Sequence, residues 1–311
     1  MMRVLIVASY NKGRFTPFIE EQAKALEMRG CAIRFFGLQG KGIKGYVKNM
    51  PLLRKEIKSF QPDVIHAHYG LSGLLANLQR RVPVVTTYHG SDINDKKALR
   101  FSETAMRLSA WNIFVSRKTM EIAKPRKHYT LLPCGIVLSD LQLTERDEAR
   151  RQMNLSSDKR YVLFAGAFDN TVKNAGLAKE VVASLQDDNV ELLELKGFSR
   201  EEVTLLMCAA NALLMTSFSE GSPQVIKEAM SCGCPIVSVD VGDVKERVEG
   251  VEGCYVAKTR ESNELADLLM KAMSYDDKTK GRERIFSDGL ENDIVARKLM
   301  EVYDKALKKI I

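Results

Sequence analysis

Short apolar runs alternate with helical patterns along this chain, and the whole alternation occurs twice. The first half has apolar runs at 4–8, 32–36, 63–67, 82–88 and 112–116, with helical patterns at 18–29 and 52–59. The second half has apolar runs at 161–165, 190–193, 212–215 and 235–239, with helical patterns at 175–185, 200–208 and 223–231. Apolar strands separated by helices are typical of parallel sheets covered by helices on both faces. The sequence therefore predicts an α/β protein with two Rossmann-like, doubly wound domains.

A polar stretch at 139–159 separates the two halves. We place the first domain at 1–141, the second at 142–290, and an amphipathic C-terminal helix at 291–311. Periodicity leaves open whether this helix caps the second domain or returns to the first. In doubly wound sheets, ligands bind beyond the carboxyl ends of the strands, so functional residues are expected directly after strands.

Charge is distributed unevenly between the halves. Residues 1–141 hold 23 Lys and Arg against 10 Asp and Glu, whereas the whole chain has a net charge of +7. Such a basic half fits nucleic acid, an anionic membrane surface or a phosphorylated acceptor. No nucleic-acid-binding motif accompanies the charge, so we predict no nucleic-acid partner.

One basic, partly amphipathic stretch lies around 42–60. It could bind an anionic membrane, or it could be a solvated helix pair. Its cations are Lys41, Lys44, Lys48, Arg54, Lys55 and Lys58, and its apolar residues are Ile43, Tyr46, Val47, Leu52 and Leu53.

The remaining composition favours a cytoplasmic protein without a structural metal. No segment has the ~18 uninterrupted apolar residues of a membrane span, and the first apolar run is too short for a signal peptide. The six cysteines form no paired CxxC sets, and Cys232 and Cys234 are expected to be buried fillers. His66 and His68 lie on a predicted strand, where we expect them to point to opposite faces and not to share a metal.

The segment 219–230 carries two carboxylates eight positions apart, Glu220 and Glu228. Between them, Ser222 is a suitable N-cap and Pro223 suits the first helical position. The N–H groups at a helix start favour an anion. This layout fits a nucleotide sugar, with one Glu accepting from sugar hydroxyls and the other from ribose hydroxyls. The alternative is an ordinary capped surface helix with solvated glutamates.

Several segments in this order resemble the GT-B glycosyltransferases, in particular family 4, the large retaining group. The resemblance covers nearly the whole chain. It comprises Pro62-Asp63-Val64-Ile65-His66-Ala67-His68, Thr87-Tyr88-His89-Gly90-Ser91-Asp92, Leu132-Pro133-Cys134-Gly135-Ile136, Phe164-Ala165-Gly166 with Lys173-Asn174, and Ala229-Met230-Ser231-Cys232-Gly233-Cys234-Pro235-Ile236-Val237-Ser238. The resemblance implies two Rossmann-like domains facing a cleft.

The resemblance also implies roles for donor-site residues. Lys173 would neutralise the donor diphosphate, and Asn174 would belong to the same donor-binding site. Glu220 would bind the donor sugar, and Glu228 would bind the ribose. Gly221 and Ser222 would offer N–H groups. Residues 196–199 would lie near the nucleobase. The family usually has an Arg directly after the glycine at the strand end, but this chain has Ala167 there. Arg14 or Arg117 of the first domain would be candidates to compensate.

In the first domain, the resemblance places His89 near the reacting centre, as a partner of a sugar hydroxyl or of the acceptor. The alternative is a histidine bonded within its own loop. Asp92 is expected to shape that loop. The loop after the first strand often carries two glycines in the family. Here it has the single Gly13, which is expected to belong to the donor-binding site because a glycine lets the backbone approach a ligand closely. The flanking Lys12 and Arg14 could meet a phosphate or be solvated.

The function implied is transfer of a hexose from a nucleotide diphosphate sugar, with retention, to a glycan or lipid-linked acceptor in cell-surface polysaccharide synthesis. His89, Lys173 and Glu220 are the catalytic candidates. No Asp-x-Asp signature stands at a strand end, so no metal cofactor is expected. The alternative is a nucleotide-sugar-binding scaffold of the same fold with little turnover. A protein attached peripherally to the inner face of the cell membrane is compatible with either function.

Overall fold

The computed structural model describes residues 1–139, 141 and 143–308, with the side chain of Ile43 outside the described part. Contacts divide the chain into two compact units. The first comprises Met1–Gly135 with Leu290–Ile311, and the second comprises Ile136–Gly289. The sequence-based boundary at 141 lies a few residues further along the chain than this division.

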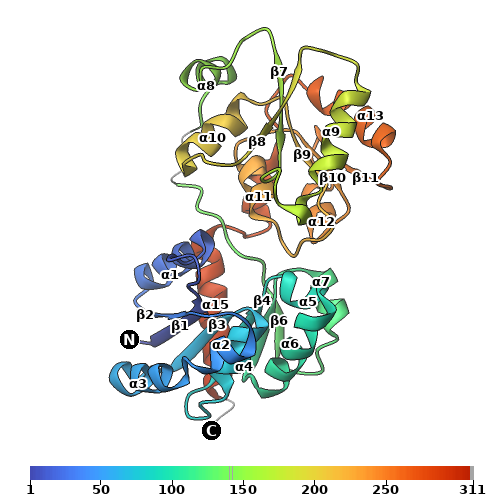
Figure 1. The fold of residues 1–311 in the computed structure, drawn as a ribbon. Helices are drawn as coiled ribbons and strands as arrows, with labels where there is room; N and C mark the ends of the chain where they lie inside the picture. Colours follow the sequence, from blue (N-terminus) through green and yellow to red (C-terminus); the bar gives the residue numbers. More distant parts are fainter. Residues whose placement is uncertain (140, 142, 309–311) are drawn as a thin grey trace. The chain divides into compact units, whose positions relative to one another are not determined.

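The first unit contains a parallel six-stranded sheet in the order β2-β1-β3-β4-β5-β6 (Figure 1). Its strands are β1 (Arg3–Ser9), β2 (Ala32–Leu38), β3 (Val64–His68), β4 (Val84–Tyr88), β5 (Trp111–Phe114) and β6 (Tyr129–Leu131). Its helices are α1 (Pro17–Met28), α2 (Gly42–Val47), α3 (Met50–Phe60), α4 (Gly70–Asn77), α5 (Ser91–Asn94), α6 (Lys96–Leu108), α7 (Arg117–Ala123) and α15 (Asn292–Lys308).

Strand β1 shows why both faces of this sheet must be covered. Its alternate residues Val4 and Ile6 pack with α1 and α15, whereas Leu5 and Val7 pack with α3 and α4. All four side chains are fully buried. Because successive side chains of a strand point to opposite faces, an unbroken apolar run requires helices on both sides.

The C-terminal helix α15 belongs to the first unit. Val295, Leu299 and Val302 lie in one apolar cluster with residues of β1 and α1. At the other edge of the α1–α15 contact, Arg29 forms a bidentate ion pair with Asp293. The question that periodicity left open is therefore settled by packing.

The second unit contains a parallel five-stranded sheet in the order β11-β10-β9-β7-β8. Its strands are β7 (Arg160–Phe164), β8 (Val190–Glu194), β9 (Ala212–Met215), β10 (Ile236–Val239) and β11 (Cys254–Ala257). Its helices are α8 (Arg146–Gln152), the 3₁₀ turn η1 (Thr171–Lys173), α9 (Ala175–Ser184), α10 (Arg200–Ala209), α11 (Gln224–Ser231), α12 (Val244–Val248), α13 (Ser262–Met273) and α14 (Gly281–Ser287).

Both sheets have the same kind of switch point. In the first, β1 pairs with β2 on one side and β3 on the other; in the second, β7 pairs with β8 and β9. The connections from the first strand of each unit therefore diverge, at β1/β3 in the first sheet and at β7/β9 in the second. Open α/β sheets bind ligands at such points, so the loops after these four strands are where sites are expected.

The packing of α15 generates a stability prediction. Leu299→Ala should lower the free energy of unfolding by about 2–5 kcal/mol, because Leu299 is only 1% exposed and its removal leaves a cavity. Arg297→Ala, an exposed position on the same helix, is the matched control and should change it by less than about 0.5 kcal/mol. Urea unfolding measures both. Equal effects of the two variants would contradict the placement of α15 in this core.

Candidate functional site

His89 lies at the start of the loop that follows β4, and Asp92 holds that loop in place. The Asp92 carboxylate accepts hydrogen bonds from the backbone N–H groups of Gly70, His89 and Gly90, at 2.9, 3.0 and 3.0 Å. Asp92 thus ties the loop after β4 to the start of α4, which agrees with the loop-shaping role predicted for it. Burial raises its pKa to about 6, although these N–H groups oppose the shift.

The side chains of His68 and His89 are in direct contact. His68 Nδ1 lies 3.0 Å from His89 Nε2, and their rings stack with centroids 5.2 Å apart. His89 Nδ1 lies 3.7 Å from the Sγ of Cys134, and a thiol is a weak hydrogen-bonding partner. A substrate hydroxyl could therefore displace Cys134 from Nδ1 more readily than it could displace His68 from Nε2.

The prediction that His66 and His68 point to opposite faces is wrong. Their ring centroids are 4.3 Å apart, because residues i and i+2 of a strand share one face. The N atoms of His66 lie 2.8 Å from the Tyr303 hydroxyl and 2.7 Å from Thr87 Oγ1. Burial lowers the pKa of His66 to about 3 and that of His68 well below its usual value, so both rings are neutral at pH 7.

Gly13 lies in the loop after β1, on the other side of the β1/β3 switch point from the start of α4. Its φ of +70° is in the region that favours glycine, and its N–H donates to the Tyr10 carbonyl in a tight turn. A Cβ at Gly13 would meet no atom within 4 Å. The backbone conformation, and not crowding, therefore requires glycine at this position.

In the second unit, Lys173 and Glu220 meet across the β7/β9 switch point. Lys173 ends η1, which follows β7, and Glu220 lies in the loop after β9. The Nζ of Lys173 is 2.7 Å from Oε1 of Glu220, and the side chains are 19% and 15% exposed. The sequence predicted separate roles for these residues, and the structure brings them together as an ion pair.

The position of Lys173 is fixed by its neighbours. Thr216 donates to the carbonyls of Lys173 and Asn174, at 3.0 and 2.9 Å, and so joins the end of η1 to the loop after β9. Asn174 adopts a left-handed conformation with φ 55° as the N-cap residue of α9. A Cβ at Gly166 would lie 2.8 Å from the Lys173 side chain, so this glycine leaves the space that the lysine occupies.

The predicted cap of α11 is wrong by one position. Pro223, and not Ser222, is the N-cap residue, and no side chain caps the helix. Ser222 instead donates to Asp243 Oδ2 at 2.8 Å. A side chain at Gly242 would collide with the carbonyl of Gly221, so the loop after β10 packs closely on residues 221 and 222. The uncapped start of α11 nevertheless keeps the anion-favouring character that the sequence indicated.

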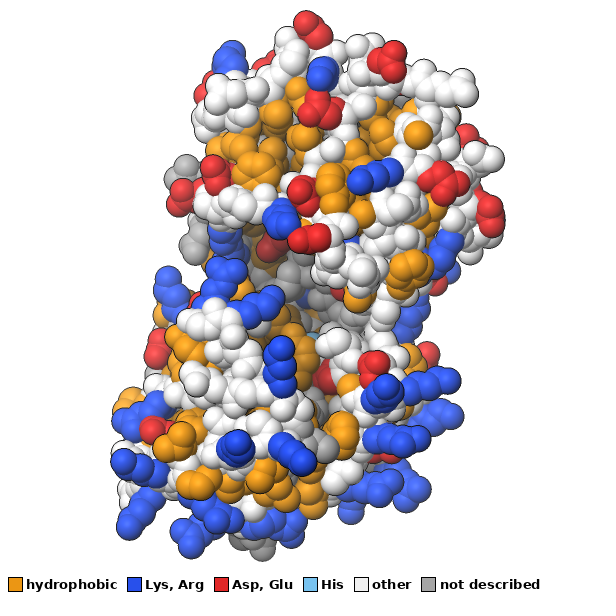
Figure 2. All heavy atoms as spheres, viewed as in Figure 1, with side chains coloured by type: hydrophobic (Ala, Val, Ile, Leu, Met, Phe, Trp, Pro, Cys, Tyr) orange, Lys and Arg blue, Asp and Glu red, His pale blue; other side chains and the backbone are white. Residues whose placement is uncertain are grey.

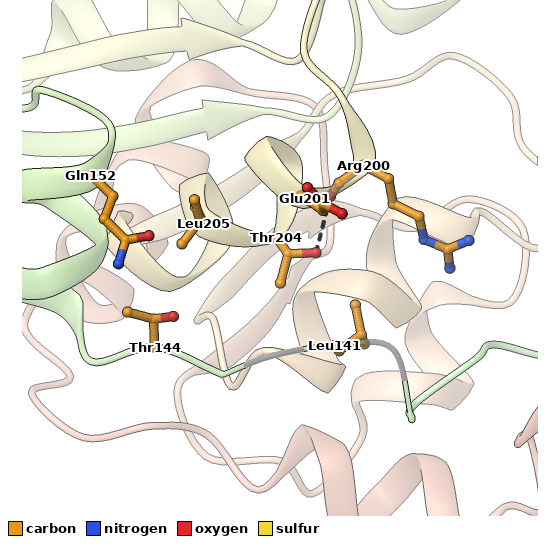
Figure 3. Close-up of a pocket in the computed structure, with 7 residues that line it drawn as sticks. All are labelled: Leu141, Thr144, Gln152, Arg200, Glu201, Thr204 and Leu205. Carbon is orange, nitrogen blue, oxygen red and sulfur yellow. Dashed lines mark hydrogen bonds between the residues drawn. The ribbon is translucent and has the colours of Figure 1, made fainter.

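Glu228 lies on the first turns of α11 and is half-buried. Burial raises the pKa of Glu228, and the nearby charges of Arg200 and Lys227 offset only part of this rise. Arg200 begins α10 and also borders a cavity of about 540 Å³ between Leu141, Thr144, α8 and α10. In Figure 3 its guanidinium extends away from Gln152, on the far side of the cavity, and its backbone carbonyl accepts from Thr204 at 3.1 Å.

Sequence reasoning missed three residues that shape these sites. Lys227 is fully buried and donates to Gln224 Oε1 at 2.8 Å. Burial raises the pKa of Asp243 and of Glu228, and the charge of Lys227 partly offsets both rises. Arg260 donates to the carbonyls of Thr216 and Phe218 and so supports the loop that leads to Glu220. His68 orients His89. Lys227 and Arg260 have no local sequence signal, because their roles depend on contacts formed in the folded protein. The position of His68 follows from strand alternation.

Other predicted residues take structural roles in the described part of the chain. Ser199 caps α10 in a capping box with Glu202. Lys196 pairs with Asp169 at the surface. Cys232 and Cys234 are buried, and burial raises the pKa of the Cys234 thiol, which fits their expected role as fillers. No group of three or more potential ligands is placed to hold a metal among the residues that the structure describes.

The chain resembles known sequence families along most of its length. Residues 15–140 match the model described as Glycosyltransferase Family 4, and residues 164–274 match Glycosyl transferases group 1. A putative teichuronic acid biosynthesis glycosyltransferase of Bacillus subtilis, TuaC, is 26% identical over 69% of this chain and 62% of its own length. The amylovoran biosynthesis glycosyltransferase AmsK of Erwinia amylovora is 26% identical with the same coverage. The matched region thus spans less than two thirds of these relatives.

Solved structures with the same fold include a sucrose-phosphate synthase from Thermosynechococcus elongatus, with a TM-score of 0.82, 18% identity, and coverage of 99% of this chain and 100% of that one. Anabaena HepE in complex with UDP and glucose has a TM-score of 0.75 and 18% identity, covering 98% of this chain and 100% of that one. At this identity the likeness establishes the two-domain α/β fold of the GT-B type.

The buried Asp92 generates a pH prediction. Its folded-state pKa of about 6 lies above the ordinary value, so folding favours the protonated carboxyl. Between about pH 4 and pH 6, the folded state binds the proton and the unfolded state does not, so stability falls as the pH rises. Asp92→Asn should remove this part of the pH dependence, as measured by urea unfolding from pH 4 to 7.

Asp267→Asn, which replaces an exposed carboxylate of α13, is the control and should retain the wild-type pH dependence. An Asp92→Asn curve parallel to that of the wild type through this range would show that Asp92 does not titrate there.

Proposed function

Because the chain belongs to the family 4 glycosyltransferases, we propose that it transfers a hexose from a nucleotide diphosphate sugar, with retention, to a glycan or lipid-linked acceptor. The observation that carries the donor assignment is the contact of Lys173 with Glu220 at the β7/β9 switch point, 2.7 Å between Nζ and Oε1. An ammonium suits a diphosphate and a carboxylate suits sugar hydroxyls. A nucleotide sugar carries a diphosphate and sugar hydroxyls within one molecule.

The ion pair sets the conditions for donor binding. The Lys173 ammonium has three N–H donors, so one can remain with Glu220 while others turn to diphosphate oxygens. Ala167 supplies no second cation after β7. Lys173 and the uncapped start of α11 would therefore stabilise most of the charge that develops on the leaving diphosphate. Glu228, with Asn174, Gly221 and Ser222 around the same strand ends, completes the proposed donor site.

Retention would proceed by front-side attack, in which the leaving phosphate helps to take the acceptor proton and neither glutamate acts as a nucleophile. His89 would contact a hydroxyl of the donor sugar or the acceptor through Nδ1. No Asp-x-Asp signature follows a strand, so we propose that charge on the diphosphate is neutralised by Lys173 and backbone N–H groups without a metal.

Polysaccharide synthesis is the proposed biological context. TuaC and AmsK are named for the biosynthesis of teichuronic acid and amylovoran, both polymers, and HepE has been solved with UDP-glucose. We extend this context to the present chain as a cell-surface polysaccharide transferase. Its acceptor would be a growing glycan, either free or linked to a lipid, at the cytoplasmic side of the membrane.

Turnover of the donor tests this proposal. Purified protein incubated with UDP-glucose, UDP-N-acetylglucosamine or GDP-mannose and a mixed glycan acceptor pool should release nucleoside diphosphate, including in the presence of EDTA. Lys173→Ala and Glu220→Gln should each lower the rate by about 10²–10³-fold. Lys271→Ala, which removes an exposed lysine of α13, is the control and should keep the wild-type rate. Wild-type rates in both site variants would refute the site assignment.

The same experiment separates an enzyme from a scaffold. Ala167, at the position where the family usually has an arginine, is the observation that favours a scaffold with little turnover. A donor present at about 100 times its Kd should stabilise either protein by about 2.7 kcal/mol. Stabilisation without release of nucleoside diphosphate in any acceptor arm would identify the scaffold.

Peripheral attachment to an anionic membrane is the second proposal for the first unit. Lys and Arg side chains cover much of its visible face (Figure 2). In the 41–58 stretch all six cations are exposed, as are Val47 and Leu52, whereas Tyr46 and Leu53 are buried in the core. The side chain of Ile43 lies outside the described residues. No described helix has the length and apolar character to cross a bilayer.

Because most of the exposed side chains here are cations, attachment would depend on charge. Binding to phosphatidylglycerol vesicles in about 50 mM salt should be lost in about 500 mM salt. Replacing Lys44, Lys48 and Lys55 with Gln should weaken it, whereas neutral phosphatidylcholine vesicles should not bind. Absence of binding to anionic vesicles at low salt would refute membrane attachment.

A further inference from the structure

A cavity of about 410 Å³ opens in the first unit at the β1/β3 switch point. It is lined by the loop after β1, the start of α1, the start of α4 and one side chain of α2. We call this cavity the switch-point pocket. Its lining residues include Lys12, Arg14, Thr16, Tyr46, Tyr69 and Ser72. Its volume lies in the range of small-molecule sites, which run from about 300 to 1,000 Å³.

The lining of the switch-point pocket is positively charged. Lys12 and Arg14 border it, and no Asp or Glu is among its lining residues. In the described part of the chain, neither cation is within ion-pair distance of a carboxylate. At the other switch point, by contrast, Lys173 forms an ion pair with Glu220. The two free cations thus leave a site for an anion.

Buried hydroxyl groups point to a polar ligand independently of these charges. Ser72 is only 1% exposed and Tyr46 only 9%, and both line the pocket. Among the described residues, neither hydroxyl has a hydrogen-bond partner. Neither oxygen is among the described buried polar atoms that lack a partner, so each remains accessible to a hydrogen-bonding group in the cavity. Two hydroxyls that open into one cavity favour a ligand rich in oxygen atoms.

The backbone around the pocket adds further donors. Both α1 and α4 begin at this cavity. No N-cap side chain bonds to either helix, although the Asp92 carboxylate accepts a hydrogen bond from the first N–H of α4, that of Gly70. The first N–H groups of a helix lack partners within it and attract negative charge. Tyr69, directly before α4, has a φ of +72°, which is a strained conformation for a bulky residue. Strain of this kind concentrates at functional sites.

The pocket adjoins the proposed reacting centre. The ring of Tyr69, which lines the pocket, lies 4.5 Å from that of His89, and Phe18 in the first turn of α1 lies 5.0 Å from it. Both distances join ring centroids within the first unit. A ligand in the pocket would therefore be held within one side chain of His89.

We propose that the switch-point pocket binds an anionic oxygen group of the acceptor, a phosphate or a sugar carboxylate, through Lys12, Arg14 and the hydroxyls of Tyr46 and Ser72. The proposal rests on the proposed function, since it names the class of acceptor. The acceptor is then a charged sugar, and the hydroxyl to be glycosylated lies near His89.

Binding of charged sugars tests the proposal without requiring turnover. Glucose 6-phosphate, glucuronate and uncharged glucose are titrated into the full chain at about 50 mM salt, by calorimetry or ligand-observed NMR. One or both anions should bind, and glucose should bind at least about tenfold more weakly. The tighter of the two anions identifies the group as phosphate or carboxylate. The variant Lys12→Ala/Arg14→Ala should weaken the anion by about tenfold or more, because charge-assisted hydrogen bonds are lost.

Two control variants locate the binding. Lys24→Ala removes an exposed lysine of α1 outside the pocket and should bind the anions as the wild type does. Lys173→Ala should also retain binding, because the donor site lies in the second unit. Circular dichroism confirms that each variant is folded, and Ser72→Asp, which places a carboxylate in the pocket, should abolish anion binding in a chain with both cations intact.

Three results would overturn the proposal: equal binding of glucose and both anions, unchanged binding in the Lys12→Ala/Arg14→Ala variant, or loss of binding in Lys173→Ala. Its failure is distinct from failure of the proposed function. Release of nucleoside diphosphate with no anion binding at this pocket would leave the transferase proposal standing. Anion binding at the pocket, without release of nucleoside diphosphate with any acceptor, would support the pocket proposal and refute the transferase proposal.

Discussion

The pairing of β1 with β3, and of β7 with β9, is the constraint on which both candidate sites depend. In each sheet the first strand of the unit lies between the second and third strands, and its two neighbours are reached by connections that leave in opposite directions. The loops after the paired strands cannot cover the space between them, because each leads away to a different face. Lys173 and Glu220 meet at one such point, and the switch-point pocket opens at the other.

The two switch points are supplied with charge in different ways. In the second unit the cation is half of an ion pair, and its partner loop is held by Thr216, Arg260 and the contact of Ser222 with Asp243. A largely buried lysine without a carboxylate would be costly, so Glu220 maintains the site before any ligand binds. In the first unit Lys12 and Arg14 are exposed, and water solvates them at little cost. The proposed donor site is thus held by an ion pair, whereas the proposed acceptor pocket has solvated cations.

Particular residues show which parts of the fold and of the candidate sites could be predicted from the sequence. Strand and helix positions were predictable because the apolar periodicity of β1, β9 and α10 is set by burial on a sheet. The cap of α11 was misassigned because Ser222 is bonded to Asp243, which is 21 residues further along the chain. Strand alternation places His66 and His68, two positions apart, on one face of β3. The prediction that they point to opposite faces was therefore an avoidable error. The pairing of Lys173 with Glu220 joins residues 47 positions apart and has no local signal.

The sequence by itself determined the two α/β domains, the family, and the set of charged residues that follow strands, because these depend on local periodicity and on motifs contiguous in the chain. Only the tertiary structure decided that α15 packs in the first unit, that Asp92 ties the loop of His89 to the start of α4, and that hydroxyls of α2 and α4 open into one cavity with Lys12 and Arg14. Each of these contacts joins segments distant in sequence. Their geometry follows from strand order and helix packing, which a linear pattern does not specify.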